Sequence, residues 1–164
     1  MRYRSGMDSR TASRLGIGVQ AIAIAALFMA RDRSRGLFDS WGAFNPFLLP
    51  GATLLVVAAV AIFVWAKRTL KREWSFSARL VDDHRLVTTG PYAYVRHPIY
   101  VSLLLYMIAI GFAVTAPIVL APALVVYFVG VAIRIRAEES LLRERFGAAF
   151  EDYRRRVPAI IPFT

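Results

Sequence analysis

Residues 98–133 read PIYVSLLLYMIAIGFAVTAPIVLAPALVVYFVGVAI and carry no charged side chain. As one α-helix rising 1.5 Å per residue, this run would measure about 54 Å, whereas the hydrocarbon core of a bilayer is about 30 Å thick. The run therefore predicts two membrane spans, 99–116 and 117–133, joined by a tight turn at Thr115-Ala116-Pro117. Such a helical hairpin returns both of its ends to the same side of the membrane.

Two further apolar segments precede the hairpin, at residues 15–30 and 47–66. The first is short and contains Gln20, but arginines on both sides can snorkel and so rescue a short span. A cleaved signal peptide is the alternative for this segment, although its end, Phe28-Met29-Ala30, lacks an Ala-x-Ala-like cleavage site. The sequence therefore predicts an all-α integral membrane protein with about four transmembrane helices, forming one domain over residues 1–164.

The basic residues of the chain follow the apolar segments. There are 21 Lys and Arg against 11 Asp and Glu, and the basic residues are divided among segments that border the spans. This division favours anionic lipid headgroups as partners and disfavours nucleic acid, and no feature requires a protein partner. With the N-terminus in the cytoplasm, 18 of the 21 lie inside, so the positive-inside rule predicts cytoplasmic termini and a cytoplasmic loop at 67–97.

Metal and thiol chemistry find little support in the composition. The chain has no cysteine and only two histidines, which excludes disulfides and thiol nucleophiles and is too few for the usual zinc site. Asp82-Asp83-His84 contains residue types that bind metals, but a solvated turn is the commoner setting for such a tripeptide. We therefore predict no metal site.

The loop that leads into the hairpin is predicted to begin as an interfacial helix continuing the second span to Trp74 and to make a turn at 89–92. Pro98 suits the first position of the next helix, because its missing N–H would have no partner there. His97 then stands at the positive end of the helix dipole, which attracts carboxylates. An alternative interpretation is an interfacial tyrosine belt with a snorkelling Arg96.

The segment after the hairpin combines both charges. Arg134 and Glu138 are spaced four apart, as are Glu139 and Arg143, which is the spacing of ion pairs along a helix. Adjacent glutamates beneath a basic membrane face need local partners, although exposed pairs of this kind are each worth only about 0.3–0.5 kcal/mol. The pattern predicts a C-terminal amphipathic helix with a break at Gly147.

Two ordered motifs connect these segments to a known family. The first is LVTTGPYAYVRHPIY at residues 86–100. The second joins Glu138-Glu139-x-Leu141 to a closing pattern over residues 146–162, FGxxFxxYxxxVPxxIP. Together they resemble the isoprenylcysteine carboxyl methyltransferases and the related phospholipid methyltransferases over about residues 66–162. The resemblance implies a membrane enzyme that uses S-adenosylmethionine as its cofactor, with a catalytic region at about 67–162.

The resemblance also implies roles for individual residues. The cofactor would be enclosed by the first motif and the glutamate pair, with cofactor-binding residues Val87, Tyr94, His97, Pro98, Tyr100, Glu138 and Glu139. Arg134 matches an arginine that the family places at the reacting centre, so Arg134 and Glu139 are the expected catalytic residues. This assignment requires His97 and Glu139 to meet in one cofactor chamber at the cytoplasmic face.

The acceptor implied by the resemblance is a lipophilic molecule reached from the bilayer. Carboxyl O-methylation of an isoprenylcysteine-like acceptor is the leading hypothesis. The alternatives are N-methylation of a phospholipid or small amine and a non-enzymatic role in binding lipid.

Overall fold

The computed structural model describes residues 9–30, 48–71, 86–114 and 117–161, and every regular element in these ranges is a helix. In chain order they are α1 (Ser9–Met29), α2 (Leu48–Leu70), the short 3₁₀ helix η2 (Gly90–Ala93), α3 (Pro98–Val114), α4 (Pro117–Phe146) and α5 (Ala148–Arg156). The predicted all-α fold is confirmed. The tripeptide at 82–84, Trp74 and the residues 115–116 of the predicted turn lie outside the described residues.

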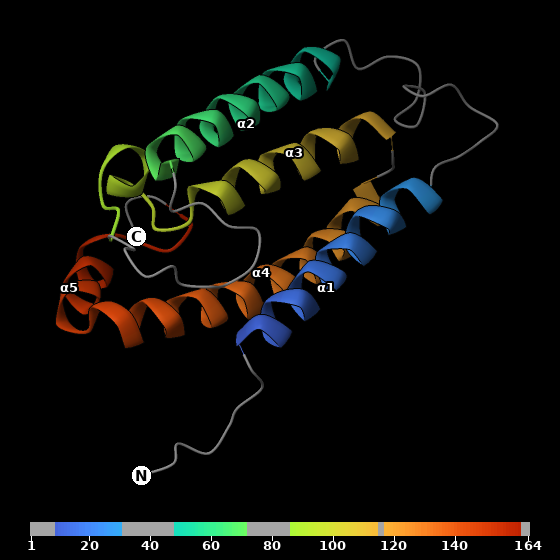
Figure 1. The fold of residues 1–164 in the computed structure, drawn as a ribbon. Coiled ribbons are helices and arrows are strands. Elements are labelled where there is room, and N and C mark those ends of the chain that lie inside the picture. The colour runs from blue at the N-terminus through green and yellow to red at the C-terminus, as the bar shows by residue number, and fades with distance from the viewer. Residues whose placement is uncertain (1–8, 31–47, 72–85, 115–116, 162–164) are drawn as a thin grey trace.

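The four long helices pack in two antiparallel pairs (Figure 1). Helix α1 lies along α4, and α2 lies along α3. Helices α3 and α4 run in opposite directions, so the chain reverses where the hairpin was predicted. The two helices diverge from this point, and they contact each other far less than α3 contacts α2 or α4 contacts α1. The prediction is therefore right about the reversal, and the two apolar helices owe most of their packing to α1 and α2.

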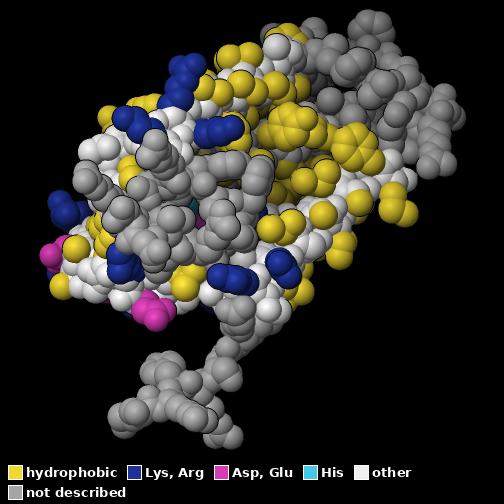
Figure 2. Space-filling model, in the orientation of Figure 1, with side chains coloured by type: hydrophobic (Ala, Val, Ile, Leu, Met, Phe, Trp, Pro, Cys, Tyr) yellow, Lys and Arg dark blue, Asp and Glu magenta, His cyan; other side chains and the backbone are white. Residues whose placement is uncertain are grey.

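Among the described residues, three helices are long and apolar enough to cross a membrane, namely Ser9–Met29, Pro50–Leu70 and Val119–Phe146. The apolar part of α3, Pro98–Phe112, is shorter, and the whole of α3 measures about 26 Å. Large apolar side chains on these helices, such as Ile22, Leu54 and Val125, remain exposed. Figure 2 shows apolar side chains over the length of the helices and Lys and Arg gathered toward one end. This distribution is that of an integral membrane protein.

Small residues line the contact between α2 and α3. The buried residues of α2 include Ala52, Ala59 and Ala66, spaced seven apart, and those of α3 include Ser102 and Ala109 with the same spacing. Small residues let two helix backbones approach closely, which is how helices associate where the solvent is as apolar as the side chains. Helix α2 continues four residues beyond Ala66, as predicted, and ends at Leu70.

Helix α1 crosses α4 at two glycines. A Cβ atom on Gly16 would lie 2.8 Å from the carbonyl oxygen of Gly130, and a Cβ on Gly130 would lie 2.8 Å from the carbonyl oxygen of Gly16. The same face of α1 buries Ser13 and Gln20 against α4. The first span, for which the motifs predict nothing, is therefore an integral part of the helix bundle.

This crossing makes opposite predictions for two glycines of α1. Gly16→Ala should lower the free energy of unfolding by about 1–3 kcal/mol, because the new methyl group meets a backbone oxygen that cannot rotate away. Gly18→Ala should leave stability unchanged or raise it by up to about 1 kcal/mol, because a Cβ there meets nothing within 4 Å among the described residues. Thermal unfolding in detergent checks both, and equal effects would contradict the close crossing.

The C-terminal region folds back on the start of α3. Helix α4 ends at Phe146, and Gly147 has a φ of +50°, the left-handed conformation that glycine adopts without strain, so the predicted break is confirmed. Helix α5 then buries Phe150 and Tyr153, and the Tyr153 hydroxyl donates to the carbonyl oxygen of Tyr92 at 2.7 Å. The predicted amphipathic helix is thus formed by α5 together with the end of α4.

Candidate active site

The first motif places His97 at the entrance of α3. The His97 carbonyl oxygen accepts from the backbone N–H of Tyr100 at 3.0 Å, so helical bonding starts at His97, and Pro98 occupies the next position fully buried. Two backbone bonds fix the segment from the other side: the N–H of Arg96 donates to the Pro158 carbonyl at 2.8 Å, and that of His97 donates to Ala159 at 3.0 Å. The C-terminal segment thereby holds the motif in position.

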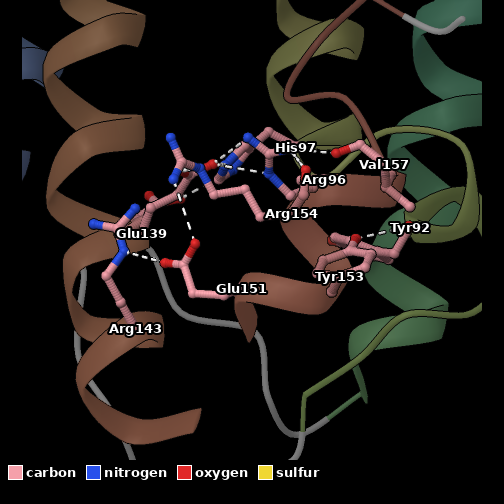
Figure 3. Close-up of polar contacts among 10 residues, drawn as sticks. Tyr92, Arg96, His97, Glu139, Arg143, Glu151, Tyr153, Arg154 and Val157 are labelled. Carbon is pink, nitrogen blue, oxygen red and sulfur yellow. Dashed lines mark hydrogen bonds and ion pairs between the residues drawn. The ribbon is translucent and has the colours of Figure 1, made fainter. Parts of the chain in front are cut away.

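Glu139 of α4 meets His97 and Arg96 directly (Figure 3). Its Oε1 atom lies 3.2 Å from His97 Nε2 and accepts from Arg96 Nε at 2.9 Å, with Arg96 Nη2 at 2.8 Å. All three side chains are largely buried. His97 and Glu139 therefore meet, as the predicted site requires, and the cofactor chamber and its side of the membrane stay predictions.

Glu138 forms the second half of the cluster. Its Oε1 accepts from the hydroxyl of Tyr100 and lies 3.7 Å from Arg134 Nη2, while its Oε2 lies 3.6 Å from His97 Nδ1. The Tyr100 ring stacks on His97 with centroids 5.6 Å apart, and the Arg134 guanidinium carbon sits 4.9 Å from the Tyr100 centroid. Two carboxylates, the His97 imidazole and the guanidiniums of Arg96 and Arg134 thus converge where the apolar part of α4 ends.

The alternative interpretation of Arg96 and the ion pair expected from the spacing of Glu139 and Arg143 are both wrong. Arg96 does not snorkel: its side chain is 10% exposed, it pairs with Glu139, and its Nη1 donates to the carbonyls of Arg154 and Val157. The predicted pair of Glu139 with Arg143 does not form, because Arg143 pairs with Glu151 of α5. The predicted pair of Arg134 with Glu138 is present. Arg96 and Arg143 each pair instead with a carboxylate that a neighbouring helix supplies.

The remaining predicted site residues lie at the margin of this cluster. Val87 is half-buried in the irregular segment before η2. Tyr94 is 58% exposed, and its ring centroid is 6.4 Å from that of Trp65 on α2. The structure thus brings together His97, Tyr100, Arg134, Glu138 and Glu139, and it leaves Tyr94 on the outer side.

Sequence reasoning did not identify Gln20 or Arg154 as members of this region. Gln20 Oε1 accepts from Arg134 Nη1 at 3.2 Å, and Arg154 Nε lies 3.6 Å from Glu139 Oε2. Gln20 carries one usable signal, since it is the polar residue inside the first apolar segment, and polar residues within spans are costly unless they face a functional interior. Arg154 carries no such signal, because it belongs to a run of three arginines.

Burial and the two neighbouring carboxylates shift the pKa of His97 in opposite directions. Burial lowers the pKa of His97, but its hydrogen bonds to Glu138 and Glu139 and their negative charges outweigh this effect and raise the pKa above the ordinary value of 6.5. The imidazolium form is therefore stabilised between the two glutamates.

The raised pKa predicts a pH-dependent contribution of His97 to stability. A group whose pKa is higher in the folded state stabilises fully below its unfolded pKa, about 6.5, and loses this contribution as the pH rises through the folded value. The stability difference between wild type and His97→Gln should therefore be largest below about pH 6.5 and shrink on alkalinisation, by about 1.4 kcal/mol for each pH unit that separates the folded pKa from the unfolded one. Thermal unfolding across pH measures it, and a difference that grows with pH would contradict the assignment.

The cluster has the donor and acceptor types for a polar cofactor with several functional groups. Carboxylates suit hydroxyl and ammonium groups, and the stacked His97 and Tyr100 rings, both nearly buried, form the aromatic side of the cluster. Glu138 keeps 27% of its side chain exposed, so one carboxylate is reachable from outside. Within the described ranges no group of three or more His, Cys, Asp or Glu side chains is placed to hold a metal ion.

The region that carries His97, Arg134 and Glu139 is similar to known proteins. The profile of the isoprenylcysteine carboxyl methyltransferase (ICMT) family matches residues 52–144. The nickel-cobalt-cadmium resistance protein NccN of Alcaligenes xylosoxydans xylosoxydans is 44% identical over 163 residues, covering 96% of this chain and 69% of NccN. The cobalt-zinc-cadmium resistance protein CzcN of Cupriavidus metallidurans is 33% identical over 159 residues, covering 93% of this chain and 65% of CzcN.

Methyltransferases of the family match the C-terminal part. Protein-S-isoprenylcysteine O-methyltransferase B of Arabidopsis thaliana is 35% identical over 85 residues, covering 52% of this chain and 43% of the plant protein. The chain thus spans about two thirds of the resistance proteins and less than half of this methyltransferase. Because the profile covers more than half of the chain and one relative matches nearly all of it, the chain belongs to the isoprenylcysteine carboxyl methyltransferase family of methyltransferases.

Proposed function

We propose that this protein is an S-adenosylmethionine-dependent membrane methyltransferase that methylates the carboxylate of a lipophilic, isoprenylcysteine-like acceptor. The observation that carries the proposal is the 3.2 Å approach of His97 to Glu139, which joins two distant motifs where the apolar helices end. A charged cofactor and a lipophilic acceptor come from different phases. They can meet only where water and bilayer meet.

The residues of the cluster fit this cofactor by their chemistry. Glu138 and Glu139 would hold the ribose hydroxyls or the amino group, and His97 and Tyr100 would face an aromatic or cationic part. When bound, S-adenosylmethionine supplies an electrophilic methyl group on a sulfonium sulfur. Val87, Tyr94 and Pro98 would complete the walls on the side of the first motif.

Arg134 would orient the acceptor. Its guanidinium can bind both oxygens of a carboxylate, which places one oxygen for in-line attack on the methyl group. A carboxylate is already ionised near neutral pH, so the reaction needs no general base, and alignment is the main contribution of the protein. An amine acceptor would instead have to lose a proton.

The charge distribution supports a cytoplasmic site. Lys and Arg gather toward the end of the molecule that carries α5 and the cluster (Figure 2), and the positive-inside rule assigns such an end to the cytoplasm. The bilayer would then supply the acceptor from the side, between helices.

The test is a methylation assay with protein purified in detergent. We expect transfer of label from S-adenosylmethionine to N-acetyl-S-farnesyl-L-cysteine, with a base-labile methyl ester as product. A methylamine formed on phosphatidylethanolamine or a small amine would instead identify an N-methyltransferase. Transfer to no lipophilic acid or amine, together with no binding of S-adenosylhomocysteine in calorimetry, would favour a non-enzymatic lipid-binding role.

The relatives that cover nearly the whole chain motivate a second proposal. NccN and CzcN are named for resistance to nickel, cobalt, cadmium and zinc. We propose that methylation by this chain contributes to metal tolerance, without the chain itself binding the ion. Growth on nickel of a bacterium expressing wild type or Arg134→Ala tests this, and equal protection by both would show that methyl transfer is not the cause.

A further inference from the structure

We propose that Gln20 of α1 and Tyr127 of α4 form, together with Arg134, the subsite that binds the carboxylate of the lipophilic acceptor. This inference rests on the proposed function and extends it to the crossing of α1 and α4. The first span then has a role in recognition as well as in anchoring.

The crossing places the three side chains side by side. Gln20 packs on Gly130, since a Cβ there would lie 2.8 Å from Gln20 Cγ. Tyr127 and Arg134 stand about one turn to either side of Gly130 on α4, and the Tyr127 oxygen lies within the electrostatic influence of Arg134 and within hydrogen-bonding reach of the Gln20 side chain. The glycine pair thus creates the close approach that lets a residue of α1 reach the arginine.

The contact with Arg134 fixes the orientation of the Gln20 amide. A guanidinium only donates, so the amide must turn its oxygen toward it, and Arg134 Nη1 donates to Gln20 Oε1 at 3.2 Å. The Nε2 donor therefore points away from Arg134. It is buried, in a side chain that is 6% exposed, and forms no hydrogen bond of good geometry among the described residues, although the Tyr127 oxygen is within its reach.

Tyr127 adds a second donor without an acceptor. Its side chain is 1% exposed, and its hydroxyl has no hydrogen-bond partner within the described part of the chain. An unpaired buried donor costs free energy, and no bulk water is present at the depth of a span to compensate for it. The crossing therefore offers three groups that can donate to a ligand oxygen, from Gln20, Tyr127 and Arg134.

A carboxylate matches this set. It is acceptor-only and offers about four lone-pair sites, enough for the guanidinium, the amide and the hydroxyl together. Arg134 is the cation of the set, and Glu138 already lies 3.7 Å from it, which favours a singly charged ligand over a phosphate. Exposed apolar side chains border the crossing, such as Ile17, Val126 and Val129, so a lipophilic tail can remain in the bilayer.

The experiment compares an acid with its ester. The probes are N-acetyl-S-farnesyl-L-cysteine and its methyl ester, and the readout is thermal stabilisation of the full chain in detergent, which needs no turnover. The acid should stabilise the wild type more than the ester does. Gln20→Leu and Tyr127→Phe should abolish this difference and raise KM for the acid about tenfold.

Two controls separate recognition from folding. Tyr106→Phe removes the same hydroxyl from an exposed position of α3 and should behave as the wild type. Without ligand, Tyr127→Phe should be as stable as the wild type or more so, because it removes a buried donor without an acceptor, whereas Gln20→Leu also removes the oxygen that accepts from Arg134 and should be somewhat less stable. Loss of acid recognition together with retained stability in Tyr127→Phe is not expected of a purely structural role.

The outcomes distinguish this inference from the proposed function. A wild type that binds acid and ester equally, or binds neither, overturns the carboxylate subsite, as do variants that keep the preference for the acid. Binding of S-adenosylhomocysteine to the same samples, measured by calorimetry, is expected to stay within about twofold of wild type in both variants. Its absence from the wild type would refute the methyltransferase proposal, whereas the acid and ester comparison would still test the subsite.

Discussion

Glu139→Ala is expected to weaken binding of S-adenosylhomocysteine more than 100-fold and to lower the free energy of unfolding by about 3–5 kcal/mol. Glu139 is the shared acceptor of Arg96 and His97, and the side chains of both are nearly buried. Its removal leaves the buried Arg96 without its counter-charge and His97 with Glu138 as its remaining carboxylate, which costs far more than loss of an exposed pair. Calorimetry and thermal unfolding measure the two effects.

Two further variants separate cofactor binding from folding. Glu139→Gln keeps an oxygen that can accept from Arg96 and should recover much of the stability, while ligand binding remains weak because the charge is absent. Glu144→Ala removes an exposed carboxylate five residues along α4 and should change neither property. Binding of S-adenosylhomocysteine by Glu139→Ala at wild-type affinity would refute the cofactor role.

The parts of the fold that follow from the length of an apolar segment could be predicted from the sequence. The charge-free run at 98–133 is too long for one span, so a reversal near Pro117 is required by bilayer thickness alone. That reversal brings the two ends of the run to one side. The meeting of His97 with Glu139 then follows from the motifs on either side of it.

Packing partners and ion pairs could not be predicted in the same way. The spacing of Glu139 and Arg143 favours a local pair, yet Glu139 binds Arg96, 43 residues away, because a tertiary contact excludes water more completely. The pairing of α1 with α4 depends on the close approach of Gly16 to Gly130. A single glycine in a sequence does not indicate which other glycine it will pack against. A sequence pattern shows which face of a helix is apolar or charged. The site depends on which helix faces pack against each other, and the pattern does not contain that information.

Arg134→Ala is expected to lower kcat/KM for a lipophilic carboxylic acid by about 10²–10³-fold while leaving binding of S-adenosylhomocysteine close to wild type. Arg134 is held in place by Gln20 Oε1 at 3.2 Å, Glu138 Oε1 at 3.7 Å and the ring of Tyr100 at 4.9 Å. These contacts come from three helices, so the guanidinium is preorganised for a ligand before the ligand arrives. Its loss should therefore impair alignment of the acceptor rather than retention of the cofactor.

Arg136→Ala is the matched control for this variant. Arg136 lies two residues along the same helix, carries the same charge beside the same membrane face, and is exposed. If the arginines served only to attract anionic lipid, the two substitutions would have equal effects. If Arg134 binds the reacting carboxylate, activity falls only in Arg134→Ala, and Arg134→Lys recovers part of it at most, because an ammonium cannot bind both oxygens in one plane. An equal loss in both variants would assign Arg134 to lipid anchoring and remove the acceptor-binding role.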